Sequence, residues 1–123
     1  MCYNNLKNIA EYYAVATTYW CNDGQGNGTG YAGRIIIRNG LAFLYLDFIM
    51  KRELNQPSSV NNAGLITNAP IPLFTQFYYT WDTSNSRRLN LYIDSSGYLR
   101  VIGSPNALAG DRFIFNMVYP VAI

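Results

Sequence analysis

The chain has 123 residues, a mass of 13.9 kDa and a formal net charge of +2, which is the size of one domain and too little charge to suggest a nucleic-acid partner. Only 13% of its residues are charged, whereas 15% are aromatic, and aromatic-rich, charge-poor surfaces are typical of stable protein interfaces. We expect a single domain over residues 1–123. No stretch reaches the roughly 20 apolar residues of a membrane-spanning helix, so we expect no membrane insertion.

The N-terminal segment precedes the first expected strand. Apolar residues at helical spacing within residues 3–13 indicate a short helical turn, which makes residues 1–11 a lead-in to the domain. Residues 12–21, YYAVATTYWC, are rich in Tyr, Val and Thr and predict a strand. Cys2 and Cys21 permit one disulfide at most, and because the N-terminus lacks the apolar region of a secretory signal, we expect two free thiols.

The segment that follows is rich in glycine. Residues 22–30, NDGQGNGTG, contain four of the ten glycines and predict a mobile loop, since this composition has little to bury. Asp23, Gln25 and Asn27 match the first ligand positions of a calcium-binding EF-hand loop, but Arg34 stands where a bidentate Glu is required. A cationic side chain cannot hold calcium, so a plain loop is the better interpretation.

Residues 33–50, GRIIIRNGLAFLYLDFIM, carry the clearest structural signal in the chain. Asn39-Gly40 suits the two positive φ angles of a type I′ turn, and strand-forming residues flank it, so we predict a tight antiparallel hairpin. The second arm, residues 41–50, is apolar on both faces, whereas a strand with one wet face alternates apolar and polar residues. This arm must be covered twice, and another subunit is a candidate for the second cover.

The remainder of the chain alternates turn signals with short strands. A polar segment with Pro57 marks a connection, and residues 82–88, DTSNSRR, form a turn cluster. Further strands are expected at residues 64–68, 73–81, 89–94, 98–103 and 112–121. About eight short strands in total favour an all-β fold, either an antiparallel β-sandwich or jelly roll or a barrel.

The side chains needed for catalysis are scarce. The sequence has no histidine, which removes Ser-His-Asp and Cys-His nucleophile systems and every zinc site that contains histidine. The seven acidic residues are dispersed, and most stand where turns or strand ends favour Asp, so a pair of catalytic carboxylates has little support. We expect a protein that is not an enzyme and that needs no metal and no cofactor.

Four stretches in sequence order carry a resemblance to a known family: GRIIIRNGLAFLYLDF, GLITNAPIPL, LNLYIDSSGYLRVIG and GDRFIFNMVYPV, which together span residues 33–121. In order, they predict a hairpin with an Asn-Gly turn, a short strand that runs into prolines, a late hairpin and a closing strand. This order resembles the C-terminal head domains of bacteriophage receptor-binding and tail-fibre proteins of the baseplate. The resemblance implies a small trimeric β-barrel or jelly roll, with residues 1–11 next to a stalk.

The same resemblance implies a role in the virion, at the tail tip or baseplate of a particle assembled in the host cytoplasm. The head would attach to a saccharide of the host cell surface without changing it. Its partners would be its own copies in a homotrimer, a polysaccharide of the bacterial envelope, and other tail or baseplate proteins. The alternative is a structural or assembly trimer of a phage tail, baseplate or capsid, whose aromatic surfaces serve only subunit contacts.

Two sets of residues are candidates for these contacts. Aromatic faces stack on sugar rings and nearby polar groups bind the hydroxyls, which favours a cluster around the 82–88 turn as the saccharide site. This candidate site consists of Tyr79, Trp81, Asp82, Arg87 and Arg88, and strand alternation places Tyr78 on the opposite face from Tyr79. The candidate trimer interface consists of Leu44, Leu46, Phe48, Met50, Phe113 and Phe115.

Overall fold

The computed structural model describes residues 9–54, 63–103 and 106–122, and the fold of these residues is all-β, as predicted. The strands are β1 (Ile9–Thr17), β2 (Cys21–Asp23), β3 (Tyr31–Arg38), β4 (Leu41–Met50), β5 (Gly64–Thr67), β6 (Gln76–Trp81), β7 (Arg88–Ile93), β8 (Leu99–Val101) and β9 (Arg112–Pro120). No helix that could span a membrane occurs in this part of the chain.

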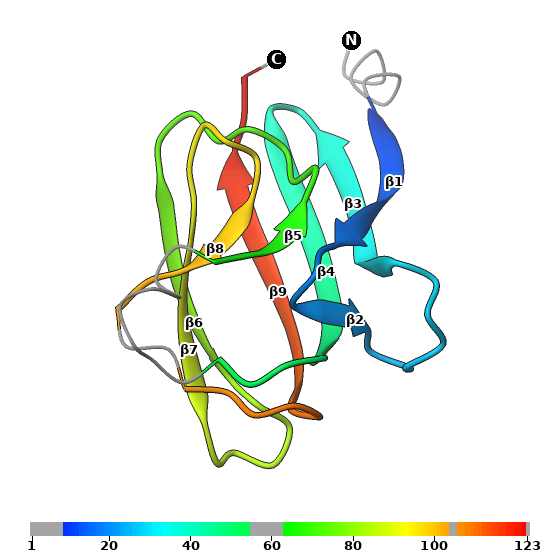
Figure 1. Ribbon diagram of the computed structural model, residues 1–123. Helices are drawn as coiled ribbons and strands as arrows, with labels where there is room; N and C mark the ends of the chain where they lie inside the picture. Colours follow the sequence, from blue (N-terminus) through cyan, green and yellow to red (C-terminus); the bar gives the residue numbers. More distant parts are fainter. Residues whose placement is uncertain (1–8, 55–62, 104–105, 123) are drawn as a thin grey trace, which may run out of the picture.

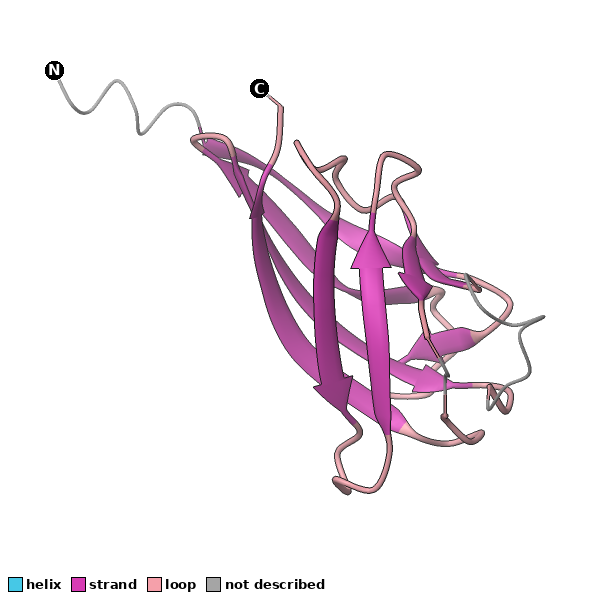
Figure 2. Ribbon diagram, turned by 90° about the vertical axis from the view of Figure 1, so that its left-hand side faces the viewer, coloured by secondary structure: helices cyan, strands magenta, loops and turns pink. Residues whose placement is uncertain are grey.

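All nine strands belong to one antiparallel sheet that curls into a half-barrel (Figure 1, Figure 2). The strand order is β2-β4-β3-β1-β5-β8-β7-β6, and β9 also pairs with β4. The curl brings β9 back toward the segments that flank β6. Two hydrogen bonds link them: the Thr83 N–H donates to the Arg112 carbonyl at 2.8 Å, and the Leu73 N–H donates to the Pro120 carbonyl at 3.0 Å. These two bonds join the two sides of the half-barrel.

The central hairpin forms as the sequence predicts. Arg38 pairs with Leu41 across the two-residue loop, and Asn39 and Gly40 have φ angles of 52° and 78°, as a type I′ turn requires. The late hairpin also forms, with β7 paired to β8 and Gly97 in the left-handed region at a φ of 76°. In both places a residue tolerant of positive φ sets the register of the strands that follow.

The N-terminal predictions were partly wrong. Residues 9–13 belong to strand β1 rather than to a helical turn, because pairing with β3 gives their backbone groups partners that outweigh a weak helical pattern; residues 1–8 lie outside the described part. The strand expected over residues 12–21 is also interrupted, since β1 ends at Thr17 and β2 begins at Cys21.

The Thr18 hydroxyl explains where the chain leaves the sheet. It donates to the Gly64 carbonyl at 2.6 Å and accepts the Trp20 N–H at 3.3 Å, which stabilises a turn between β1 and β2. Cys21 follows as a free thiol in the core, where its Sγ–H donates to the Leu65 carbonyl at 2.8 Å. Cys2 lies outside the described residues, so the state of its thiol stays a prediction.

The core of the half-barrel lies on its concave face and contains the residues that we assigned to a trimer interface. Alternate positions of β4 and β9 point inward, and they pack against apolar residues of β3, β5, β7 and β8. The interface prediction is therefore wrong for all six residues, each at most 7% exposed in a single chain: Leu44, Leu46, Phe48, Met50, Phe113 and Phe115. Phe48 packs against Phe113 and Phe115, with ring centroids 5.5 Å and 6.0 Å apart.

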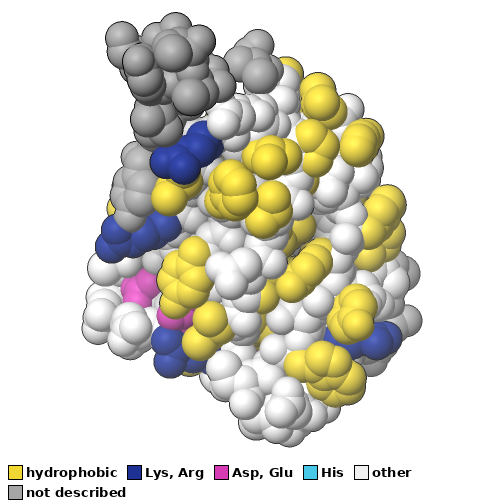
Figure 3. All heavy atoms as spheres, turned by 180° about the vertical axis from the view of Figure 1, so that it is seen from behind, with side chains coloured by type: hydrophobic (Ala, Val, Ile, Leu, Met, Phe, Trp, Pro, Cys, Tyr) yellow, Lys and Arg dark blue, Asp and Glu magenta, His cyan; other side chains and the backbone are white. Residues whose placement is uncertain are grey.

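The opposite face of the same strands is apolar and exposed. Ile36 of β3 pairs with Phe43 of β4, which pairs with Val118 of β9, so three apolar side chains form one row across the sheet. Leu41 extends the row along β4. We call these four residues the outer face, and Figure 3, viewed from behind, shows how widely hydrophobic side chains are spread over that side of the molecule.

Candidate functional site

Strand β6 carries the most exposed aromatic side chains of any described strand. It lies at one end of the sheet, and its alternate residues Phe77, Tyr79 and Trp81 point outward with 68%, 60% and 46% of their surface exposed. Tyr78 points the other way and stacks on Phe115 of β9 with ring centroids 5.2 Å apart. The strand therefore uses one face to hold the half-barrel together and leaves the other to solvent.

Strand β7 adds polar groups beside these rings. The antiparallel register pairs Phe77 with Tyr92, Tyr79 with Asn90 and Trp81 with Arg88. The Arg88 guanidinium carbon lies 5.3 Å from the Tyr79 ring centroid and 5.8 Å from that of Trp81, within the range of cation–π attraction. We call these six residues the aromatic strip: Phe77, Tyr79, Trp81, Arg88, Asn90 and Tyr92.

An open depression of about 370 Å³ lies alongside the aromatic strip. Phe77, Tyr79 and Asn90 line it, together with Ile102 and Gly103 from the segment after β8. Its volume falls in the range of small-ligand sites, and it combines apolar walls with an amide. Flat rings with a guanidinium and an amide at their edge can stack on the apolar face of a sugar ring and bind its hydroxyl groups.

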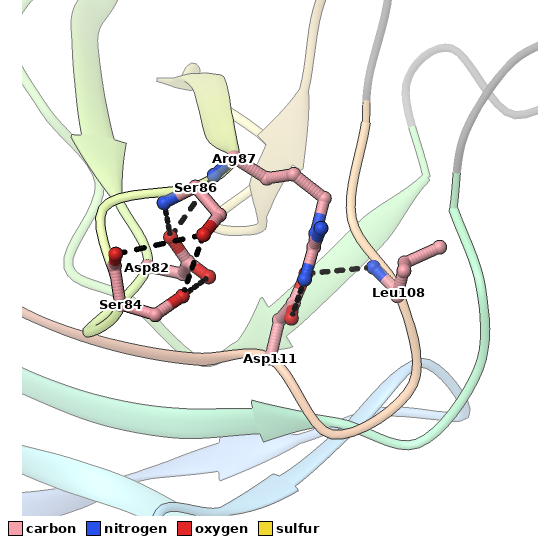
Figure 4. A network of polar contacts seen from close by, with 6 residues as sticks. All are labelled: Asp82, Ser84, Ser86, Arg87, Leu108 and Asp111. Carbon is pink, nitrogen blue, oxygen red and sulfur yellow. Dashed lines mark hydrogen bonds and ion pairs between the residues drawn. The ribbon is translucent and has the colours of Figure 1, made fainter.

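Asp82, at the end of β6, has a structural role instead of the predicted binding role. The residue is 2% exposed, and its carboxylate accepts hydrogen bonds from the Ser84 hydroxyl at 2.7 Å, the Ser86 N–H at 2.7 Å and the Arg87 N–H at 3.0 Å (Figure 4). Burial raises the pKa of this carboxyl, but the hydrogen bonds outweigh burial and leave the pKa below its ordinary value. The carboxylate thus organises the turn that connects β6 to β7.

Arg87 likewise points away from the strip. Its guanidinium binds both carboxylate oxygens of Asp111, with Nε–Oδ2 at 2.6 Å and Nη2–Oδ1 at 2.7 Å (Figure 4). The Leu108 N–H donates to the same carboxylate at 2.8 Å, and the bonds from Arg87 are the main reason why the pKa of Asp111 is lowered. The ion pair ties the 82–87 turn to the segment before β9.

The structure therefore divides the five predicted site residues into two groups. Tyr79, Trp81 and Arg88 lie together on the outer surface, whereas Asp82 and Arg87 hold the turn beneath them. The sequence reasoning missed Phe77, Asn90 and Tyr92. Period-two alternation from Tyr79 identifies Phe77, but the other two depend on the register between β6 and β7, which the sequence does not give.

Reactive groups are few in the described part of the chain. No set of three or more His, Cys, Asp or Glu side chains there is placed to hold a metal ion. The buried Cys21 thiol has its pKa raised to about 12, chiefly because burial disfavours the thiolate. At neutral pH this thiol stays protonated and unreactive.

One of three comparisons with known proteins, the comparison with solved structures, supports the fold. No protein-family model matches the chain, and no curated protein matches it. Among solved structures, the chain is similar to a bacteriophage receptor-binding protein. That structure is the receptor binding protein gp15 of Listeria phage PSA, with a TM-score of 0.60 and 12% sequence identity over 98% of this chain and 70% of that chain. The chain thus has the fold of a phage receptor-binding protein, which confirms the fold part of the predicted resemblance.

Proposed function

We propose that this domain is the receptor-binding head of a phage tail protein, and that it attaches to a saccharide of the host cell surface through the aromatic strip. The observation that carries the proposal is the strip itself: three exposed rings on one face of β6, flanked by Arg88 and Asn90, on a fold like that of gp15. Exposed aromatic residues are costly to leave in water, so a surface that gathers three of them favours a ligand.

The proposed activity is binding without turnover, in a virion at the tail tip or baseplate. The groups at the strip are rings, a guanidinium and an amide, which can hold a sugar but lack a nucleophile or a carboxylate pair. Each site would be weak, because an open depression buries only part of a ligand. Several copies on one particle would raise the avidity by roughly 10²-fold or more.

The outer face supports the proposed homotrimer. Its row of Ile36, Phe43 and Val118 is aliphatic and aromatic, crosses three strands, and would leave water if copies of the chain packed against one another. The predicted trimer is therefore retained with its interface moved to the opposite face of β4. This face also favours the second candidate function, an assembly trimer of a tail, baseplate or capsid that binds no receptor.

Two measurements on the unmodified protein test these proposals together. Light scattering at micromolar concentration should give a mass three times the 13.9 kDa of one chain. Fluorescently labelled protein should adsorb to intact cells of a host, in a panel of bacteria that begins with Listeria, and purified envelope polysaccharide of that host should compete. A trimer that ignores every envelope tested would support the assembly role and contradict receptor binding.

A further inference from the structure

The glycine-rich loop before β3 is ordered by one carboxylate. Asp23 is buried and accepts hydrogen bonds from the backbone N–H groups of Gln25 at 3.0 Å, Asn27 at 3.1 Å and Thr29 at 2.9 Å, and from the Thr29 hydroxyl at 3.1 Å. These bonds, led by that of Thr29, lower the pKa of Asp23 to about 2. The sequence predicts a mobile loop from the glycines alone, whereas the structure gives this loop an anchor.

Two glycines let this loop and β3 approach β4 closely. A Cβ atom on Gly24 would lie 1.7 Å from Oδ1 of Asp47, and one on Gly33 would lie 1.8 Å from the Tyr45 carbonyl oxygen. Gly33 has no room for a side chain against the backbone of β4, and a side chain at Gly24 would displace the Asp47 carboxylate. The Gly24 N–H also donates to the Asp47 carbonyl at 2.9 Å, which fixes the start of the loop to the sheet.

The loop, β3 and β4 together line an open hollow of about 380 Å³, which we call the loop hollow. Two exposed tyrosines stand at it, Tyr31 at 53% and Tyr45 at 44% exposure. The other lining residues are glycines and polar residues, which include Gln25, Asn27 and Thr29. The loop hollow is thus pre-formed, of ligand size, and lined by rings, amides and a hydroxyl.

We propose that the loop hollow is a second binding site, for a neutral pyranose ring of a glycan. Tyrosine faces suit the apolar side of such a ring, and the amides of Gln25 and Asn27 can both donate to and accept from its hydroxyl groups. The inference extends the proposed function, because it gives each chain a second contact with the same class of ligand.

The charges around the loop hollow give an acidic sugar no advantage over a neutral one. Its lining contains two carboxylates, Asp23 and Asp47, against one guanidinium, that of Arg34. The Asp47 carboxylate already binds Arg112, with Oδ2–Nη2 at 2.7 Å, and that of Asp23 already accepts the donors of the loop. With Arg112 counted, the two carboxylates and the two guanidiniums balance, so glucuronate should gain no affinity over glucose.

Backbone amide shifts of the intact protein in solution provide the test. The ¹⁵N-labelled protein, in its native oligomeric state, is titrated with methyl glycosides of glucose, galactose, N-acetylglucosamine and rhamnose, and with glucuronate. At least one neutral glycoside should shift the amides of residues 25–31 and 45 at millimolar concentration. Shifts at the aromatic strip alone would overturn the second site and leave the proposed function standing, whereas adsorption failure with shifts at the loop hollow would contradict the proposed function alone.

A pair of tyrosine variants removes the remaining ambiguity. Tyr31→Ala should weaken binding of the responding glycoside by roughly fivefold to tenfold, since one stacked ring is lost. Tyr19→Ala is the matched control, because Tyr19 is 62% exposed and lies outside the loop hollow. Equal affinities for Tyr31→Ala, Tyr19→Ala and the unmodified protein would overturn the assignment.

Discussion

Strands β4 and β6 both leave large apolar side chains in solvent, but the two surfaces differ in composition. The outer face of β4 continues into β3 and β9 as a row of Ile36, Phe43 and Val118. The outward face of β6 carries only aromatic rings, with an arginine and an amide beside them on β7. The first surface is broad and hydrophobic, whereas the second is narrow and amphipathic.

This difference indicates two kinds of partner. A broad apolar surface on the exposed face of a sheet is well suited to contact a second protein, because association removes the whole apolar surface from water. Rings next to hydrogen-bonding groups suit a ligand that is apolar on one side and polar at its rim, as a sugar is. We therefore propose that subunit contacts use the outer face and that receptor contacts use the aromatic strip.

The largest effect is expected when the inner face of β4 is changed. Phe48→Asp should prevent folding, because an unpaired buried charge costs several kcal/mol and a whole domain is stable by only about 5 to 15 kcal/mol. Circular dichroism should show loss of the strand signal. A folded but monomeric Phe48→Asp variant would mean that this face is the subunit interface after all.

A change on the outer face of β4 should separate the subunits without unfolding them. Phe43→Asp places a charge in the middle of the exposed row, where it stays solvated in a single chain but would be buried in a trimer. Light scattering should then report one chain of 13.9 kDa with an unchanged circular dichroism spectrum. Tyr19→Ala, at an exposed residue outside this face, serves as the control that keeps the mass of the unmodified protein.

A smaller effect is expected at the turn beneath the aromatic strip. Asp82→Ala removes the acceptor for the Ser86 and Arg87 N–H groups and should lower the free energy of unfolding by about 1 to 3 kcal/mol. Urea denaturation measures this loss. If the variant is as stable as the unmodified protein but no longer adsorbs to cells, Asp82 acts in binding and not in holding the turn.

The smallest effect concerns acid pH. Asp23 has a pKa of about 2 in the folded protein against an ordinary value of 3.8, so its bonds stabilise the fold fully above about pH 4. This contribution is lost as the pH falls toward 2, because the unfolded chain takes up the proton first. Urea midpoints measured between these pH values should decline less in Asp23→Asn than in the unmodified protein; parallel declines would contradict the anchoring role.

The sequence predicts the elements of this fold better than their faces. Asn39-Gly40 determines its hairpin locally, and residues such as Leu91 and Phe113 show a clear alternation, so strands and turns could be found without a structure. The arm at residues 41–50 is apolar on both faces, and which face becomes core depends on the curl of the whole sheet. Local pattern cannot supply that, and the interface prediction failed there.

The candidate site was predictable only in part, for a related reason. Tyr79 and Trp81 share a face through simple alternation, and Arg88 joins them by its pairing with Trp81. Asp82 and Arg87 are adjacent in sequence to those residues, yet they turn inward because the N–H groups of a tight turn and the carboxylate of Asp111 need partners. A prediction based on proximity in sequence therefore included two residues that do not face the strip, and it missed cross-strand neighbours such as Asn90.

Adsorption of Trp81→Ala to host cells tests the central claim most directly. Trp81 is exposed and contributes a ring to the strip, so its removal should leave the mass and the melting temperature nearly unchanged while adsorption falls by tenfold or more, at about 1.4 kcal/mol per tenfold loss. Leu73→Ala, at an exposed apolar residue outside the strip, should adsorb normally. Full adsorption by a correctly folded Trp81→Ala variant would contradict the account.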